Sequence, residues 1–146
     1  MTAADPVPRA FVDTNILVYS FANDDAVRAP VAQELLDRLM ATSAFHTSTQ
    51  VLQELFVTLF RKGQRTMGAN EILLSLDRLA KFPVFQVDYA AIRAAAKLSA
   101  GHKLSFWDAL IVVAAARSGA SVLYTEDLQH GRTILGVRIV NPFRRS

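Results

Sequence analysis

The stretch FVDTNILVY, at residues 11–19, decides how this chain is expected to fold. Two apolar residues lead directly into Asp13, and apolar residues at helical spacing follow it. The pattern predicts a short strand that runs into a helix, with a carboxylate at the junction. Ligands of open α/β sheets bind beyond the carboxyl ends of the strands, so Asp13 is a candidate for chemistry. The alternative is that Asp13 or Asn15 only caps the helix.

Strand-like and helix-like segments alternate along the rest of the chain. Further short apolar runs indicate strands at residues 44–46, 84–87, 121–124 and 137–140. Apolar side chains at helical spacing indicate helices over residues 26–40, 48–61, 70–81, 89–100 and 106–117. The alternation predicts an α/β fold, a three-layer α/β/α sandwich with a central parallel sheet of four to five strands. We expect residues 1–146 to form a single domain, with residues 1–8 as a flexible leader.

Several of the expected helices carry recognisable end signals. Thr47 and Gln50 form a capping-box pattern before the second of these helices. Asp88 is placed to cap the helix that follows it, and Gly101 is placed to end that helix. The apolar run at residues 109–116 is too short to span a membrane and predicts a buried central helix.

Composition narrows the functional classes. The chain is 51% hydrophobic and 20% charged, which is typical of a compact domain rather than a disordered one. It has no cysteine, which excludes a disulfide framework, a thiolate zinc site and a cysteine nucleophile. A net charge of +3 favours a polyanionic partner such as nucleic acid. The N-terminal residues lack the apolar run of a signal peptide, and a reducing cytoplasm is permitted.

Two further acids occupy helices. Glu54 lies on a helix that is apolar on most sides, so its carboxylate faces either a cleft or the edge of the core. At the edge of the core it would pair with Arg61 or with water. Asp108 opens the apolar helix at residues 106–117 and lies three residues after Ser105, which is also a capping pattern.

A fourth acid repeats the situation of the first. Asp127 follows the fourth strand as Asp13 follows the first, unless it only stabilises a turn. Four acids that face one crevice repel each other and do not all stay ionised unless a cation compensates them. Oxygen ligands of this kind suit magnesium or manganese, which activate a water for attack on a phosphodiester.

Four short motifs resemble the acidic motifs of PIN-domain ribonucleases. They are FVDTN at residues 11–15, QE at 53–54, FWDALI at 106–111 and TEDLQHG at 125–131. Within that family the chain resembles the small VapC-type toxins of bacterial toxin–antitoxin pairs. The resemblance runs from about Arg9 to Pro142, and the acids appear in the family's order.

The resemblance implies a function and a set of site residues. It implies that a metal-binding catalytic pocket is formed by Asp13, Glu54, Asp108 and Asp127. Asn15 and Thr125 match polar positions that steady the acids and the metal-bound water. The implied reaction is hydrolysis of RNA by a water activated by Mg²⁺, with Mn²⁺ as a substitute. The implied partners are an RNA substrate, a small antitoxin and a second copy of the chain, in the cytoplasm and without a membrane.

Basic residues near the acids are candidates for binding substrate. Arg61, Lys62 and Arg65 follow the helix that carries Glu54 and are placed to contact RNA phosphates. The alternative is a solvated helix end favoured by the helix dipole. His130 is a further candidate substrate contact, although a loop histidine without a paired ligand is more often structural.

Two other classes of function remain open from the sequence. A phosphoryl-transfer enzyme with an aspartyl phosphate also places an Asp after its first strand. Here Asn15 replaces the second acid of that pattern, and Lys103 is the lysine nearest the expected later motif. A non-catalytic module that binds RNA or a protein partner would explain the positive charge without any turnover.

Overall fold

The computed structural model describes residues 7–63 and 67–144, and it confirms the predicted α/β class. Its helices are α1 (Thr14–Ala22), α2 (Arg28–Ala41), α3 (Thr49–Lys62), α4 (Ala69–Leu79), α5 (Tyr89–His102) and α6 (Phe106–Arg117). Its strands are β1 (Ala10–Val12), β2 (Phe45–Ser48), β3 (Val84–Phe85), β4 (Val122–Tyr124), β5 (Thr133–Ile134) and β6 (Val137–Val140). Most of the expected leader at residues 1–8 lies outside the described residues.

The strands of the described chain form one sheet in the order β3-β2-β1-β4-β6-β5. All neighbours are parallel except β5 and β6, which form an antiparallel pair. The predicted parallel sheet is therefore confirmed, but the expected number of strands missed β5. That strand is only two residues long and pairs with β6 through the tight turn at Leu135 and Gly136, both of which have positive φ.

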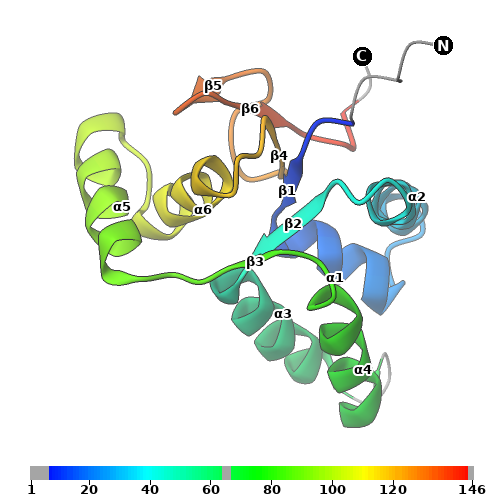
Figure 1. Cartoon of the computed structure of the whole chain (residues 1–146). Helices are drawn as coiled ribbons and strands as arrows, with labels where there is room; N and C mark the ends of the chain where they lie inside the picture. Colours follow the sequence, from blue (N-terminus) through cyan, green and yellow to red (C-terminus); the bar gives the residue numbers. More distant parts are fainter. Residues whose placement is uncertain (1–6, 64–66, 145–146) are drawn as a thin grey trace, which may run out of the picture.

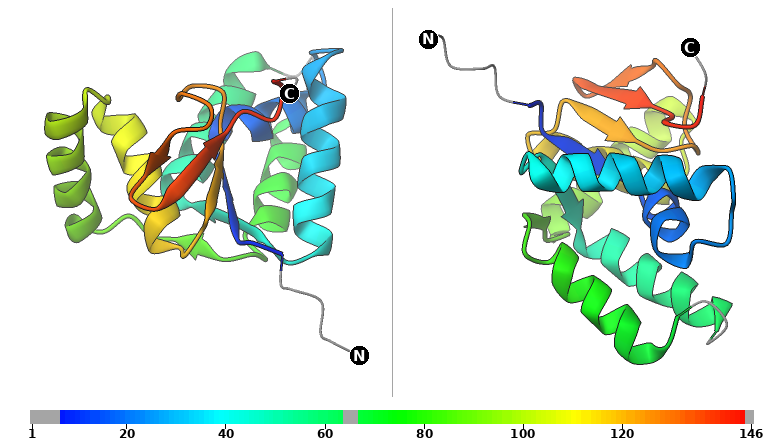
Figure 2. Two further views of the ribbon diagram at one scale, coloured as in Figure 1. Left: turned by 90° about the horizontal axis from the view of Figure 1, so that it is seen from above. Right: turned by 90° about the vertical axis from the view of Figure 1, so that its right-hand side faces the viewer.

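Helices cover both faces of the sheet, as predicted for a three-layer arrangement. Figure 1 shows α5 and α6 on one side of the strands and α1 and α2 on the other. The view from above in Figure 2 shows the same separation, with α3 and α4 packed beside each other on the α1 side. The helix α3 directly follows β2 and packs against α1, so it begins at the carboxyl end of that strand.

The predicted buried central helix is α6. Its side chains from Ala109 to Ala115 are all buried, because α6 packs between α5 and the sheet. Apolar residues around its whole circumference are the expected pattern for a helix that is covered on every side. Among the described residues, no helix is both long and apolar enough to cross a membrane.

Two of the predicted helix-end signals lie one or two residues away from the residues that cap the helices in the structure. Ser48, and not Thr47, caps α3, because its hydroxyl accepts the Val51 N–H at 3.3 Å. Thr47 instead belongs to β2. The α5 helix continues past Gly101 to His102, and Lys103 takes the left-handed conformation that ends it, with φ of 54°.

The central position of β4 can be tested by a core substitution. Leu123 is fully buried on β4, whereas Val27, just before α2, is 76% exposed. We expect Leu123→Ala to lower the free energy of unfolding by about 2–5 kcal/mol through lost burial and a residual cavity. Val27→Ala is the matched control and should change it by less than about 0.5 kcal/mol. Urea denaturation measures both, and equal effects would contradict this placement of β4.

Candidate active site

The carboxyl ends of β1 and β4 lie side by side, which brings two of the predicted acids together. Val12 is in register with Tyr124, and the Asp13 N–H donates to the Tyr124 carbonyl at 3.0 Å. The chain leaves β1 at Asp13 and leaves β4 through Thr125 towards Asp127. Both acids therefore stand at the edge of the sheet where ligands bind in this class of fold.

Asp13 is buried and held by two hydrogen bonds. Its side chain is 6% exposed. The Thr14 N–H donates to Oδ1 at 2.7 Å, and the Thr125 hydroxyl donates to Oδ2 at 2.8 Å. Burial, together with the charges of Asp127 and Glu54, raises the pKa of Asp13 to about 6, although the two hydrogen bonds lower it. Asp13 is thus both the N-cap of α1 and an acid whose ionised form is disfavoured by its surroundings.

Glu54 joins this group from α3, which follows β2, the strand on the other side of β1. Its carboxylate accepts the Thr14 hydroxyl at 3.0 Å and the Gln50 side-chain amide at 2.8 Å. An ion pair with Arg61, the alternative explanation of Glu54, is not among the ion pairs of residues 7–63 and 67–144. Glu54 is therefore fixed toward α1 rather than toward the end of its own helix.

Asp108 stands in the first turn of α6, near enough for its charge to act on Asp127. Ser105 caps α6 by accepting the Asp108 N–H at 3.0 Å, so the serine hydroxyl provides the cap. Partial burial raises the pKa of Asp127, and the negative charges of Asp108 and Glu126 raise it further. A hydrogen bond from Asn15 lowers it. The charge of Asp108 thus acts on Asp127, the acid that follows β4.

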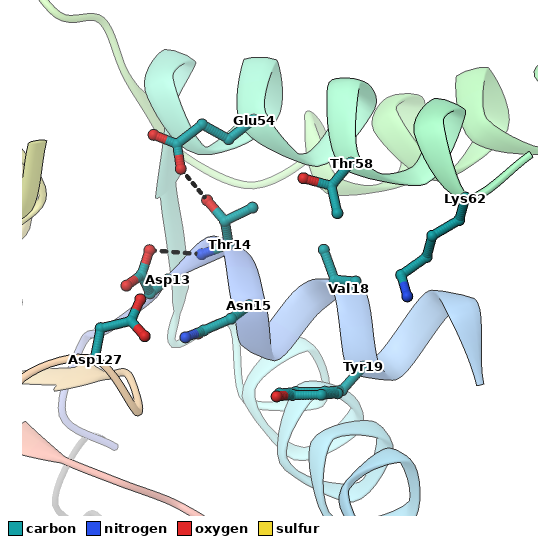
Figure 3. A pocket seen from close by; sticks show the side chains of 9 residues that line it. All are labelled: Asp13, Thr14, Asn15, Val18, Tyr19, Glu54, Thr58, Lys62 and Asp127. Carbon is teal, nitrogen blue, oxygen red and sulfur yellow. Dashed lines mark hydrogen bonds between the residues drawn. The ribbon is translucent and has the colours of Figure 1, made fainter. Parts of the chain in front are cut away.

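The acids border a cavity of about 350 Å³, drawn in Figure 3. Three carboxylates gather at one end of it, and the side chain of Lys62 reaches toward it from the far end of α3. Asp108 is close enough to influence Asp127 but does not line the cavity. The lining residues are Asp13, Thr14, Asn15, Val18, Tyr19, Glu54, Thr58, Lys62 and Asp127.

The donors at this cavity suit a hydrated magnesium ion. Within the described chain, no three acidic or histidine side chains are arranged to hold one ion directly. Mg²⁺, however, usually keeps several waters and binds through one or two carboxylates. Asn15 Oδ1 is buried without a hydrogen-bond partner among the described residues, which leaves an acceptor free beside the acids. An open, all-oxygen set of this kind fits Mg²⁺ or Mn²⁺ rather than zinc.

The residues predicted to bind substrate fall in different places. Lys62 lines the acid cavity, and Arg61 lines a neighbouring cavity of about 340 Å³ along α3. Arg65 lies outside the described residues. His130 does not line the acid cavity, and its Nδ1 accepts the Asn141 N–H at 3.0 Å. The ring of His130 thus ties its loop to the end of β6.

Sequence reasoning missed a cluster that holds the loop after β4. The Tyr19 hydroxyl donates to Glu126, and Arg28 Nε contacts the other oxygen of Glu126 at 3.2 Å. The Arg28 guanidinium lies over the rings of Tyr19 and Phe143, 5.6 Å from each centroid. Glu126 directly precedes Asp127, so the cluster anchors the backbone that carries this acid. Its contacts join residues that are far apart in the sequence, which no local pattern reveals.

Comparison with known proteins agrees with this geometry. Residues 10–133 match the PIN domain, and the chain belongs to the PIN-domain family. No curated protein sequence matches the chain.

Three solved structures share the fold. One is the sarcin-ricin loop cleaving toxin VapC20 of Mycobacterium tuberculosis, with a TM-score of 0.63, 23% identity and coverage of 81% of this chain and 91% of that one. Another is a toxin–antitoxin complex from Klebsiella pneumoniae, with a TM-score of 0.66 and 19% identity. The third is DNA-bound VapBC from Salmonella typhimurium, with a TM-score of 0.61 and 18% identity. The last two each cover 91% of this chain and 97% of their own.

The raised pKa of Asp13 predicts how stability depends on pH. In the folded chain Asp13 keeps its proton up to about pH 6, whereas the unfolded chain loses it near the ordinary aspartate pKa of 3.8. The folded state therefore binds more protons across this window, and the carboxylate destabilises the metal-free protein above it. We expect Asp13→Asn to raise the free energy of unfolding near pH 7.5 by up to about 3 kcal/mol, and to change it little near pH 4.

Urea denaturation at both pH values, with a chelator present, measures this difference. Asp88→Asn is the matched control, because Asp88 also follows a strand and caps a helix but lies outside the cavity. An Asp13→Asn effect that is the same at both pH values would contradict the raised pKa.

Proposed function

We propose that this PIN-domain protein is a magnesium-dependent endoribonuclease that hydrolyses phosphodiester bonds of RNA and acts as the toxin of a toxin–antitoxin pair. The observation that carries the proposal is the gathering of Asp13, Glu54 and Asp127 around one cavity, with Asp108 acting on Asp127. Like charges at such close range require a compensating cation if they are to stay ionised. Membership of the PIN-domain family supports the same chemistry.

The residues of the site would have separate roles in such a reaction. Bound Mg²⁺ would lower the pKa of a water and offset the charge that develops on the attacked phosphoryl group. Asp13 and Asp127 would hold the ion directly or through its waters, and Asp108 would act on it through a water. Thr125 fixes Asp13 through its hydroxyl and also accepts the Asp127 N–H at 3.1 Å, so one side chain sets the position of both acids. Fixed ligands avoid a reorganisation cost during the reaction.

Glu54 and Asn15 complete the site from the helices. The two hydrogen bonds to Glu54 use one oxygen each, so its carboxylate is held in a single orientation at the cavity wall. The side chain of Asn15 forms a hydrogen bond to Asp127 that favours its ionised form, so Asn15 would steady this acid for the ion. Positive charge along α3, from Arg61 and Lys62, would attract the RNA backbone toward these acids.

Two features support the proposed protein partners. The exposed surface of α3 and α4 carries apolar side chains that a partner would cover, with Phe56 stacked on Phe60 at 5.6 Å and Leu73 and Leu74 more than half exposed. Two of the structures that share this fold are toxin–antitoxin complexes. We therefore propose a small antitoxin and a second copy of this chain as partners, and the cytoplasm as the site of action.

The aspartyl-phosphate alternative has less support. That chemistry uses a lysine to balance the phosphorylated Asp, and Lys62 is the sole lysine among the described residues that line the cavity. Its ammonium lies 2.8 Å from Asp24, and Lys103 lies outside the cavity lining. A non-catalytic RNA-binding module remains the alternative that an activity measurement must exclude.

The decisive experiment is cleavage of RNA by the purified chain. We expect cleavage with Mg²⁺ or Mn²⁺, loss of cleavage with a chelator, and a loss of at least about 100-fold in Asp13→Asn, because several kcal/mol of transition-state stabilisation depend on the ion. Asp88→Asn is the matched control and should cleave as the wild type does. Gel analysis of labelled RNA measures all of these rates.

Two outcomes would contradict the proposal. Cleavage that persists in both the chelator and Asp13→Asn would exclude a metal held by these acids. Salt-dependent RNA binding without turnover in any divalent metal would favour the binding module. Calorimetric titration of Mg²⁺ into the wild type and Asp13→Asn separates these cases, since only the wild type should bind the ion.

A further inference from the structure

One face of α3 connects the acids to a positive charge. Glu54, Thr58 and Lys62 follow each other at intervals of four residues, so their side chains lie on the same face of the helix. All three line the acid cavity. At 1.5 Å per residue, Glu54 and Lys62 stand about 12 Å apart along the helix axis. The cavity is therefore acidic at one end and basic at the other, as Figure 3 shows.

Lys62 forms an ion pair with Asp24 that is only weakly stabilising. Its Nζ lies 2.8 Å from the Asp24 carboxylate, in the connection between α1 and α2. Both side chains remain partly exposed, at 34% for Lys62 and 40% for Asp24. An ion pair with this exposure is weak, so another anion can replace the carboxylate. A phosphate of the RNA backbone is such an anion.

We propose that Lys62 forms a subsite for an RNA phosphate two or three nucleotides away from the bond that is cut, and that Asp24 competes with this phosphate for the ammonium. The inference rests on the proposed nuclease function. Stacked nucleotides advance about 3.4 Å each along one strand, and an extended strand advances further. The span of about 12 Å between Glu54 and Lys62 then corresponds to roughly three stacked nucleotides, or to fewer extended ones.

With this subsite, the protein contacts the RNA beyond the phosphate that is attacked. The phosphate at the acid end is the one attacked, whereas the phosphate at Lys62 only binds. The hydroxyl of Thr58 lies between the two on the same helix face and can contact the intervening sugar or phosphate. A substrate that ends before the Lys62 position loses this contact but keeps the chemistry at the acids.

Two substitutions test the competition, because they are expected to change the affinity for RNA in opposite directions. Binding of the full chain to a single-stranded RNA of about 12 nucleotides is measured in chelator, so that cleavage does not interfere. We expect Lys62→Ala to weaken binding by about three- to tenfold and to lower the slope of log K against log salt by about one. Asp24→Asn should tighten binding by about two- to fivefold, because Lys62 is then free. Lys97→Ala, on exposed α5, is the matched control and should change neither quantity.

A second measurement locates the subsite. The cut made in Mg²⁺ fixes the register of the RNA, and single phosphates on either side of it are replaced in turn by neutral methylphosphonates. At one position, two or three nucleotides from the cut, the neutral linkage should weaken the wild type as much as Lys62→Ala does. At that position alone, Lys62→Ala should add no further loss. Additive losses at every position would overturn the subsite.

The outcomes separate this inference from the proposed function. If Lys62 only stabilises the end of α3, Lys62→Ala and Asp24→Asn will change the unfolding midpoint but leave the salt slope of binding unchanged, and the inference is wrong. Cleavage with this result leaves the nuclease function intact. Binding changes as expected without any cleavage support the competition between Asp24 and RNA for Lys62, but they refute the nuclease and with it a position defined by a cut. Absence of RNA binding refutes both.

Discussion

The pairing of β1 with β4 is the constraint on which the candidate site depends. It sets the Asp13 backbone against Tyr124 and thereby puts the Thr125 hydroxyl within 2.8 Å of the Asp13 carboxylate. Because Thr125 is completely buried, this bond forms in a place from which water is excluded and where electrostatic interactions are strong. A different strand beside β1 would leave Asp13 without the Thr125 hydroxyl and without Asp127.

Two sets of interactions act in opposite directions on the ionisation of Asp13. Burial and neighbouring carboxylates favour the protonated form of Asp13, whereas Thr14 and Thr125 favour the ionised form. The fully buried core around Phe11, Ile16 and Leu123 holds this arrangement in place although it is locally unfavourable. Proteins commonly keep such strained groups where they function, and the rest of the fold offsets their cost.

Local patterns in the sequence were sufficient for the α/β class, the order of the helices and the acids at strand ends. Helical periodicity and caps such as Asp88 act over a few residues and can be read directly. Contacts across the chain could not be read in this way. The strand order, the bond between Thr14 and Glu54, and the cluster of Tyr19, Glu126 and Arg28 all depend on register between distant segments. The spacing of Gln50 and Glu54, four residues apart on one helix, was a local signal that would have revealed their contact.

The two edges of the sheet limit how another chain can bind. The edge strands β3 and β5 of the described sheet are each only two residues long. Very short edge strands do not offer enough free backbone groups to extend the sheet with a foreign strand, which protects against aggregation. A peptide laid over the acid cavity would therefore gain little affinity by adding a strand to this sheet. Its contacts would be made mainly by side chains against helix surfaces, so its sequence would matter more to recognition than its backbone.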